Sequence, residues 1–337
     1  MTVPRDGVPS ASPAIAEAPP ATARTTRQRV IDWARRILVL VVVVAAVLAI
    51  VDQWPDVRAT LSRIAWWQVL LSLVTLIAGL LLGLMSWRSV VVGIAHPGPG
   101  KKISQVYLIG QMGKYVPGSV WAFLLQMEVG RKNGIARAQV FVAALVSTGV
   151  TVAASLVVGL VALPFLSREN PELQWLYLIL PMAVIALHPK VVTWLVNLVL
   201  RTLRRAPLDA PLRLKTIALS FGYAVVMYGV YGVHLWILVR SQGGIGFDNA
   251  LFATGALALG MTTGLFAFLL PSGIGAREAV LVAALGAFMP GGSALAFALL
   301  SRVMFTVGEL VCMGAAYLDL RGTHRLHAPG RRTLEAP

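Results

Sequence analysis

Two stretches interrupt the apolar segments of this chain: Gly-Gln-Met-Gly-Lys-Tyr-Val-Pro-Gly-Ser at residues 110–119 and Leu-Pro-Ser-Gly-Ile-Gly-Ala-Arg-Glu at residues 270–278. Both stretches place proline, two or more glycines and a basic residue inside strongly apolar sequence. In lipid, every backbone N–H and C=O group needs a partner, so a helix broken in this way survives only where protein or a water-filled cavity surrounds it. A pair of such breaks, one in each half of a chain, indicates a binding site inside the membrane.

The composition is that of a protein that crosses the membrane many times. Of its 337 residues, 57% are hydrophobic and only 13% are charged, and the mean hydropathy is +0.76. The net charge of +15 would favour nucleic acid as a partner in a soluble chain. Most Lys and Arg residues flank apolar segments instead, where they set orientation and contact anionic lipid head groups. We therefore expect an all-α polytopic helical membrane protein that binds no nucleic acid.

Hydropathy over windows of about 20 residues predicts about eight transmembrane helices. They cover residues 33–51, 64–87, 138–163, 173–188, 214–239, 249–270, 277–290 and 293–318. We expect residues 103–127 to form an additional re-entrant broken-helix element, and residues 189–204 to form an amphipathic helix at the membrane surface. Residues 277–290 are short for a full crossing, so a half-helix is the alternative there. An internal inverted repeat, with one break in each half, is compatible with this layout.

The regions outside the spans predict the domain organisation and the orientation. Residues 1–29 are polar and rich in proline, which predicts a disordered cytoplasmic tail before a transmembrane domain at 30–320 and a C-terminal cytoplasmic tail at 321–337. The first apolar run, 37–51, can also be read as a signal-peptide core, although a helix that begins near Val30 gives a full-length span. When the regions outside the predicted spans are assigned to the two sides of the membrane, 22 Lys and Arg residues lie on one side and four on the other. This bias predicts that both termini are cytoplasmic in a multi-pass protein of the cell membrane.

Tryptophan residues fall near the predicted helix ends, where aromatic side chains form belts at the membrane interface. We assign Trp54, Trp66, Trp67, Trp175 and Trp236 to the outer interface, and Trp87 and Trp194 to the inner one.

Five ionisable residues lie deepest in the apolar sequence: Lys114, Arg277, Glu278, Arg302 and Glu309. A charge at the centre of the bilayer costs about 2.5–3.5 kcal/mol on insertion scales, so these groups must be paired, hydrated or used. Buried ion pairs that hold the bundle together are one interpretation. Arg302 and Glu309 are seven residues apart, too far for a direct bond within one helix, so we expect them to face a shared cavity.

The breaks have the outline of an anion-binding site. After Pro271 the chain can turn tightly and start a new helix near Ala276, so that Arg277 lies in its first turn. A helix N-terminus beside an arginine favours a negatively charged ligand such as a phosphate. The alternative is a pair of kinked helices that pack through glycine without a ligand. The predicted substrate-binding residues are Lys114, Pro117, Gly118, Ser119, Ser272, Gly273, Gly275, Arg277, Glu278, Arg302 and Glu309.

At the two breaks and at Ser301 and Arg302, the chain resembles the transmembrane region of lysylphosphatidylglycerol synthases, a flippase-like family of integral membrane proteins. Residues 116–121 and 126–128 are similar to its actinobacterial branch. The resemblance covers roughly residues 37–320 and implies a membrane domain that moves phospholipids or lipid-linked substrates between leaflets. The soluble aminoacyl-transferase domain is missing after Asp319, so we do not expect a complete lipid-modifying synthase. Some members carry charged residues after the first break, whereas residues 143–148 are uncharged here.

The remaining motifs give no support for a cofactor or a metal. Residues 98–102 lack the spacing of a phosphate-binding loop, and the five histidines show no paired metal-ligand spacing. His234 lies inside a span, where we expect a hydrogen-bonded packing residue, with a proton relay as the alternative.

We therefore expect a transporter of anionic phospholipid or polyprenyl-phosphate-linked substrate that is not an enzyme and needs no cofactor. The alternatives are a membrane-embedded transferase, with Glu278 or Glu309 as general base, and a scaffold for a separate cytoplasmic synthase or glycosyltransferase. The sequence does not fix the oligomeric state.

Overall fold

The computed structural model describes residues 51–95, 100–115, 120–160, 171–202, 211–243, 246–267 and 275–326, with isolated positions at 33, 40, 44, 47, 48, 204, 207, 208 and 273. These residues form helices and their connections, without a strand among them. Five helices are long and apolar enough to cross a membrane: Trp66–Ala95, Arg137–Gly159, Leu214–Gln242, Phe247–Phe266 and Gly291–Leu318. The all-α, multi-pass class is confirmed, whereas the count of eight spans and the inverted repeat stay predictions. Most of the predicted span 33–51 and of the two tails lies outside the described residues.

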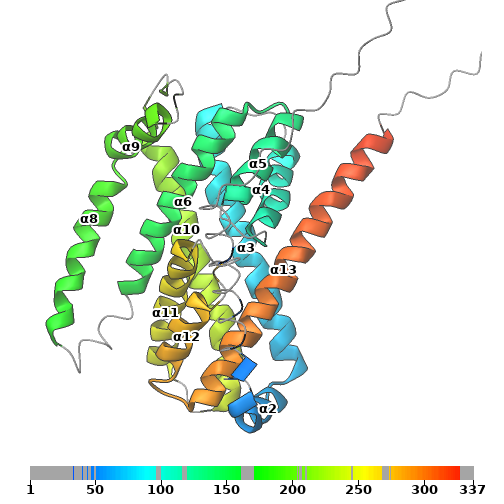
Figure 1. The fold of residues 1–337 in the computed structure, drawn as a ribbon, viewed down its shortest axis with the longest axis vertical. Coiled ribbons are helices and arrows are strands. Elements are labelled where there is room, and N and C mark those ends of the chain that lie inside the picture. Colours follow the sequence, from blue (N-terminus) through cyan, green and yellow to red (C-terminus); the bar gives the residue numbers. More distant parts are fainter. Residues whose placement is uncertain are drawn as a thin grey trace, which may run out of the picture.

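Helices α3 (Trp66–Ala95) and α10 (Leu214–Val239) form the centre of the bundle (Figure 1). Gly79 and Gly83 of α3 lie on its buried face, where a Cβ atom at Gly83 would be 3.1 Å from the Met227 sulfur. This spacing of small residues lets two helix backbones approach closely. Helix α6 (Arg137–Gly159) packs on both of them, and the long helix α13 (Gly291–Leu326) packs along α3.

Two broken elements enter this bundle from opposite ends (Figure 1). The first consists of α4 (Gly100–Gly110), the 3-10 turn η1 (Gln111–Tyr115) and α5 (Val120–Lys132). The second consists of α11 (Phe247–Phe266) and α12 (Ala276–Leu285), with Gly273 between them. In Figure 1, α4 and α5 lie in the half of the bundle that carries α9 (Pro189–Thr202), and α11 and α12 lie in the half that carries α2 (Trp54–Ser62). Each element turns back inside the bundle towards the end from which it came.

The helix bounds correct the predicted spans in several places. Helix α12 has 10 residues, which at 1.5 Å per residue is about half the hydrocarbon thickness, the length that the half-helix alternative for 277–290 requires. The predicted span 173–188 is a 3-10 helix η3 (Pro171–Leu178) followed by α8 (Ile179–Ala186). The predicted surface helix forms α9, which buries Val192, Val196 and Leu200 along one face. Its position at a membrane surface stays a prediction.

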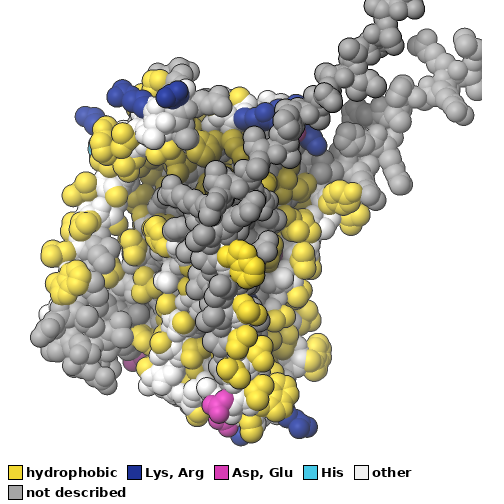
Figure 2. Space-filling model, in the orientation of Figure 1, with side chains coloured by type: hydrophobic (Ala, Val, Ile, Leu, Met, Phe, Trp, Pro, Cys, Tyr) yellow, Lys and Arg dark blue, Asp and Glu magenta, His cyan; other side chains and the backbone are white. Residues whose placement is uncertain are grey.

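Charged residues are distributed unevenly between the two ends of the bundle. Figure 2 shows most of the visible Lys and Arg side chains at the end that carries α9, which we call the basic end. The visible Asp and Glu side chains lie mainly at the opposite end. Five of the seven assigned tryptophans are widely exposed, as an interfacial belt requires: Trp54, Trp66, Trp67, Trp175 and Trp194. Trp87 is only 2% exposed, so its assignment to the belt was wrong.

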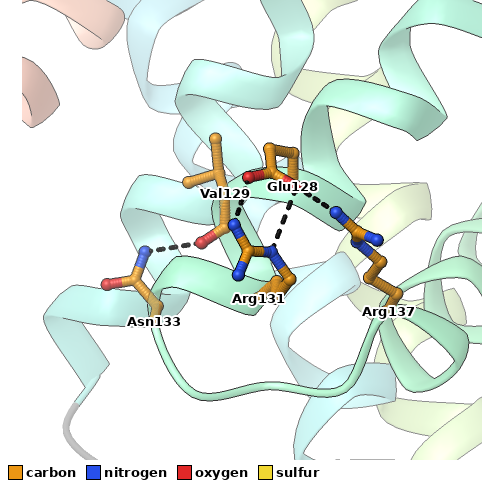
Figure 3. A network of polar contacts seen from close by, with 5 residues as sticks. All are labelled: Glu128, Val129, Arg131, Asn133 and Arg137. Atoms are coloured by element: carbon orange, nitrogen blue, oxygen red, sulfur yellow. Dashed lines mark hydrogen bonds and ion pairs between the residues drawn. The ribbon is translucent and has the colours of Figure 1, made fainter. Parts of the chain in front are cut away.

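A cluster of three charged residues, Glu128, Arg131 and Arg137, ties the end of α5 to the start of α6 at the basic end (Figure 3). One Glu128 oxygen lies 2.7 Å from Arg131 Nη2, and the other lies 2.5 Å from Arg137 Nη2. Hydrogen bonds from Arg131 and then Arg137 lower the pKa of the Glu128 carboxyl to about 2. This cluster therefore connects the C-terminal end of the first re-entrant element to the start of α6.

Candidate functional site

A cavity of about 300 Å³ lies inside the bundle where the two broken elements meet. Among the predicted site residues, those that line it are Lys114, Gly273, Arg277, Arg302 and Glu309. Lys114 comes from the turn of the first element, Arg277 from the start of α12, and Arg302 and Glu309 from α13. The two breaks therefore contribute to one cavity, and Arg302 and Glu309 share it although they are two turns apart.

Glu309 joins the turn of the first element to α13. Lys114 Nζ forms an ion pair with one carboxylate oxygen, and the Tyr115 hydroxyl donates a hydrogen bond of 2.5 Å to the other. The Lys114 side chain is 29% exposed and that of Glu309 is 13% exposed. Both charges are thus partly withdrawn from solvent and depend on each other for compensation.

The chain enters α12 through a tight glycine turn. Gly273 has a φ of +66° and Gly275 has a φ of +90°, in the region that L residues with a side chain rarely adopt. A Cβ atom at Gly273 would overlap the backbone of Gly264 in α11, so the turn is closely packed against that helix. The Gly275 N–H donates to Glu278 Oε2 at 2.7 Å. Gly275 was predicted to bind the substrate, but its amide is already capped by a side chain of the same helix.

Arg277 is buried in the cavity wall without full compensation of its charge. It is 5% exposed, and its guanidinium carbon lies 4.0 Å from the centre of the Phe305 ring. Its Nη2 atom has no hydrogen-bond partner among the described residues. The like charge of Arg302 acts on it, while Arg302 Nε is itself 3.7 Å from Glu278 Oε1.

The balance of charge in the cavity is positive. Within the described part of the chain, three cations line it, Lys114, Arg277 and Arg302, against one carboxylate, Glu309. A buried charge is costly unless an opposite charge compensates it. The arrangement therefore favours an anionic occupant.

Among the described residues, the predicted Gly275 and Glu278 do not line the cavity, and several residues that do were not predicted. Pro117, Gly118, Ser119 and Ser272 lie outside the described residues. Glu278 is connected to the site by its ion pair with Arg302, and Gly275 is the N-cap residue of α12, which carries Arg277. Unpredicted polar and aromatic lining residues include Trp87, Tyr107, Tyr115, Phe123, Gln126, Ser147, Thr148, Thr151, Tyr228, Thr262, Phe305 and Thr306. Their common signal in the sequence is a polar or aromatic residue inside a predicted membrane segment.

His234 is a hydrogen-bonded core residue, as expected. It is fully buried, its Nε2 lies 3.1 Å from Ser301 Oγ, and its Nδ1 lies 2.6 Å from Ser72 Oγ. It thus connects α10 to α3 and α13 next to Arg302.

Fold and site together define a multi-pass helical membrane protein with a cationic cavity at the meeting point of two broken helices. Residues 37–308 match the family described as Lysylphosphatidylglycerol synthase TM region, and the chain belongs to that family. The match covers both breaks and Arg302, and ends just before Glu309. The comparisons found no match among curated proteins or solved structures.

Proposed function

We propose that this protein is a flippase that moves an anionic phospholipid or a polyprenyl-phosphate-linked substrate between the leaflets of the cell membrane. The observation that carries the proposal is the cavity of about 300 Å³ with three cations and one carboxylate in its wall. Its volume is at the lower end of the range of ligand pockets, about 300–1,000 Å³, which suits a head group whose acyl or prenyl chains remain in lipid. Membership of a family of membrane regions from lipid-modifying proteins is consistent with a lipid-related role.

The two broken elements supply a means of alternating access. The first element lies in the half of the bundle at the basic end and the second in the opposite half (Figure 1), and both contribute residues to the cavity wall. An anionic head group competes with Glu309 for Lys114 and with Glu278 for Arg302, because both pairs lie at the cavity. Protonation of either glutamate would release its cation, which offers a route for coupling movement to protons. This scheme requires no covalent step, no nucleotide and no cofactor, and the basic end faces the cytoplasm in it.

The test is leaflet exchange in reconstituted vesicles. We expect fluorescent anionic lipid to cross between leaflets faster with protein than without it. Arg277→Gln and Lys114→Gln should each slow exchange by about tenfold or more, since loss of one charged hydrogen bond costs about 1.5–3 kcal/mol. Arg58→Gln, an exposed change on α2, is the matched control and should exchange lipid normally. Equal rates for wild type and both cavity variants, with the variants folded, would refute the proposal.

Product analysis and copurification address the two alternatives. Formation of a modified lipid by the purified protein would favour a transferase. Copurification with a soluble synthase or glycosyltransferase, without exchange by the protein alone, would favour a scaffold.

A further inference from the structure

Three buried polar atoms in side chains that line the cavity have no hydrogen-bond partner among the described residues. They are Trp87 Nε1, Gln126 Oε1 and Arg277 Nη2. The three residues are 2%, 6% and 5% exposed. Buried polar groups in folded proteins are nearly always paired, and three unpaired ones in the wall of one cavity indicate groups that a ligand or water must satisfy.

The chemistry of these atoms restricts the ligand. The Arg277 guanidinium and the Trp87 indole N–H are donors and require acceptors, whereas the Gln126 carbonyl oxygen requires a donor. A phosphodiester satisfies Arg277 but has no proton to give to Gln126. A hydroxyl group satisfies both Gln126 and Trp87, because it donates and accepts. A choline or ethanolamine group would bring a positive charge into a cavity that already has three.

The lining residues divide into two chemically distinct parts. The cations come from η1, α12 and α13, and the unpaired indole and amide come from α3 and α5. In the part of the wall that contains the unpaired indole and amide, the rings of Trp87 and Tyr107 lie 5.5 Å apart. Helix α6 contributes the hydroxyl groups of Ser147, Thr148 and Thr151 to the cavity wall. Aromatic rings with neighbouring amides and hydroxyls suit a polyhydroxylated ring, whose C–H face stacks and whose hydroxyls hydrogen-bond.

We infer that the head group in the cavity is a sugar phosphate, with the phosphate held by Arg277 and the sugar hydroxyls by Gln126 and Trp87. This inference deepens the proposed function and rests on it for the lipid attached to that head group. The same chemistry would also recognise a soluble sugar phosphate, so the experiment has one arm for each source.

The first arm measures binding by isothermal titration of purified protein in phosphatidylcholine nanodiscs, with glucose 1-phosphate, inorganic phosphate and phosphocholine as probes. We expect glucose 1-phosphate to bind about tenfold more tightly than the other two. Gln126→Met, which keeps the length of the side chain, should remove this preference but leave phosphate binding intact. Arg277→Gln should weaken the binding of all three phosphate-containing probes. Equal affinities in the wild type, or an unchanged preference in Gln126→Met, would overturn the inference. Trp87→Phe, which keeps a ring and removes the N–H, provides the same test if Gln126→Met does not fold.

The second arm compares leaflet exchange of a short isoprenyl-phosphate-linked glucose with that of phosphatidic acid, and includes uptake of free glucose 1-phosphate. We expect the glucose lipid to exchange about tenfold faster than phosphatidic acid, and Gln126→Met to remove the difference. Equal exchange of both lipids would refute the inference that the head group is a sugar phosphate, but would still support the proposed flippase activity. Exchange of neither lipid, with selective binding or uptake of glucose 1-phosphate, would refute the flippase and leave the sugar-phosphate site standing.

Discussion

The Glu309 carboxylate fastens the first re-entrant element to α13, because it accepts from both Lys114 and Tyr115. Lys114→Met would leave this carboxylate partly buried without its cation. We expect a loss of about 1–3 kcal/mol in the free energy of unfolding, less than for a fully buried pair because solvent reaches Lys114. The double variant Lys114→Met with Glu309→Gln should lose less than the sum of the two single changes.

Unfolding in detergent mixtures, followed by tryptophan fluorescence, measures these differences. Lys190→Met, an exposed change at the start of α9, is the control. Additive losses in the double variant would show that the two side chains do not stabilise each other.

Glu128 gives a pH prediction outside the membrane spans. Its pKa is lowered from 4.5 to about 2 by hydrogen bonds from Arg131 and then Arg137. A lowered pKa in the folded state means that the stabilisation is complete above about pH 4.5 and is lost as the pH falls towards 2. We expect the melting temperatures of wild type and Glu128→Gln to differ by a constant amount between pH 8 and 5 and to converge below pH 4. A difference that already shrinks between pH 7 and 5 would contradict this assignment.

The charged residues of the site could be predicted from the sequence because their insertion cost requires an explanation wherever they lie. Gln126 and Trp87 could not. The predicted span 64–87 placed Trp87 at a helix end, whereas α3 continues to Ala95 and carries Trp87 into the core. Whether Gln126 faces lipid, a neighbour or a cavity depends on how α5 is rotated in the bundle, which one sequence does not specify.

The two turns inside the bundle are held by glycines that have no room for a side chain. A Cβ atom at Gly113 would overlap the backbone of Trp121 and Ala122 in α5, and one at Gly273 would overlap Gly264. Gly113→Ala and Gly273→Ala should each lower the free energy of unfolding by about 1–3 kcal/mol. They should also slow lipid exchange by more than this loss of stability alone would explain.

Gly149→Ala is the matched control, because it lies in α6 with open space around its Cβ position. It should be neutral or stabilising by up to about 1 kcal/mol, as alanine is the better helix former. Melting curves and exchange rates of the three variants make the comparison. Normal exchange in Gly113→Ala and Gly273→Ala would mean that the turns do not shape the cavity.

The breaks themselves were visible in the sequence, but the length of the helix after the second break was not. Residues 286–290 are mostly apolar and therefore extended the predicted span, yet they form a turn after α12 ends at Leu285. Hydropathy measures transfer into lipid and not the continuity of a helix. No helix was predicted between the spans 33–51 and 64–87, because the residues there mix charged and apolar side chains. Residues 54–62 nevertheless form α2, which packs against α13 through a 2.9 Å contact between the hydroxyls of Thr60 and Ser293.

The uneven distribution of charge over the whole molecule predicts its orientation. The basic end carries α9 and the junction of α5 with α6 (Figures 1 and 2), where Glu128, Arg131 and Arg137 form their cluster (Figure 3). In a Cys312→Ala background, we expect Ser62→Cys at the opposite end to react with a membrane-impermeant maleimide in intact cells. Ala136→Cys at the basic end should react only after permeabilisation. The reverse pattern would invert the proposed topology.

The reactivity of a thiol at Thr306 shows whether two broken helices from opposite ends create a hydrated, cationic cavity. Thr306 lines the cavity, whereas Val303 is 58% exposed on the surface of the same helix. In the Cys312→Ala background, Thr306→Cys should react with a sulfonate-bearing methanethiosulfonate faster than with its trimethylammonium counterpart, relative to a free thiol, and Val303→Cys should show no such preference. No reaction at Thr306→Cys would mean that the cavity is closed to water, and a preference for the cationic reagent would mean that it is not cationic.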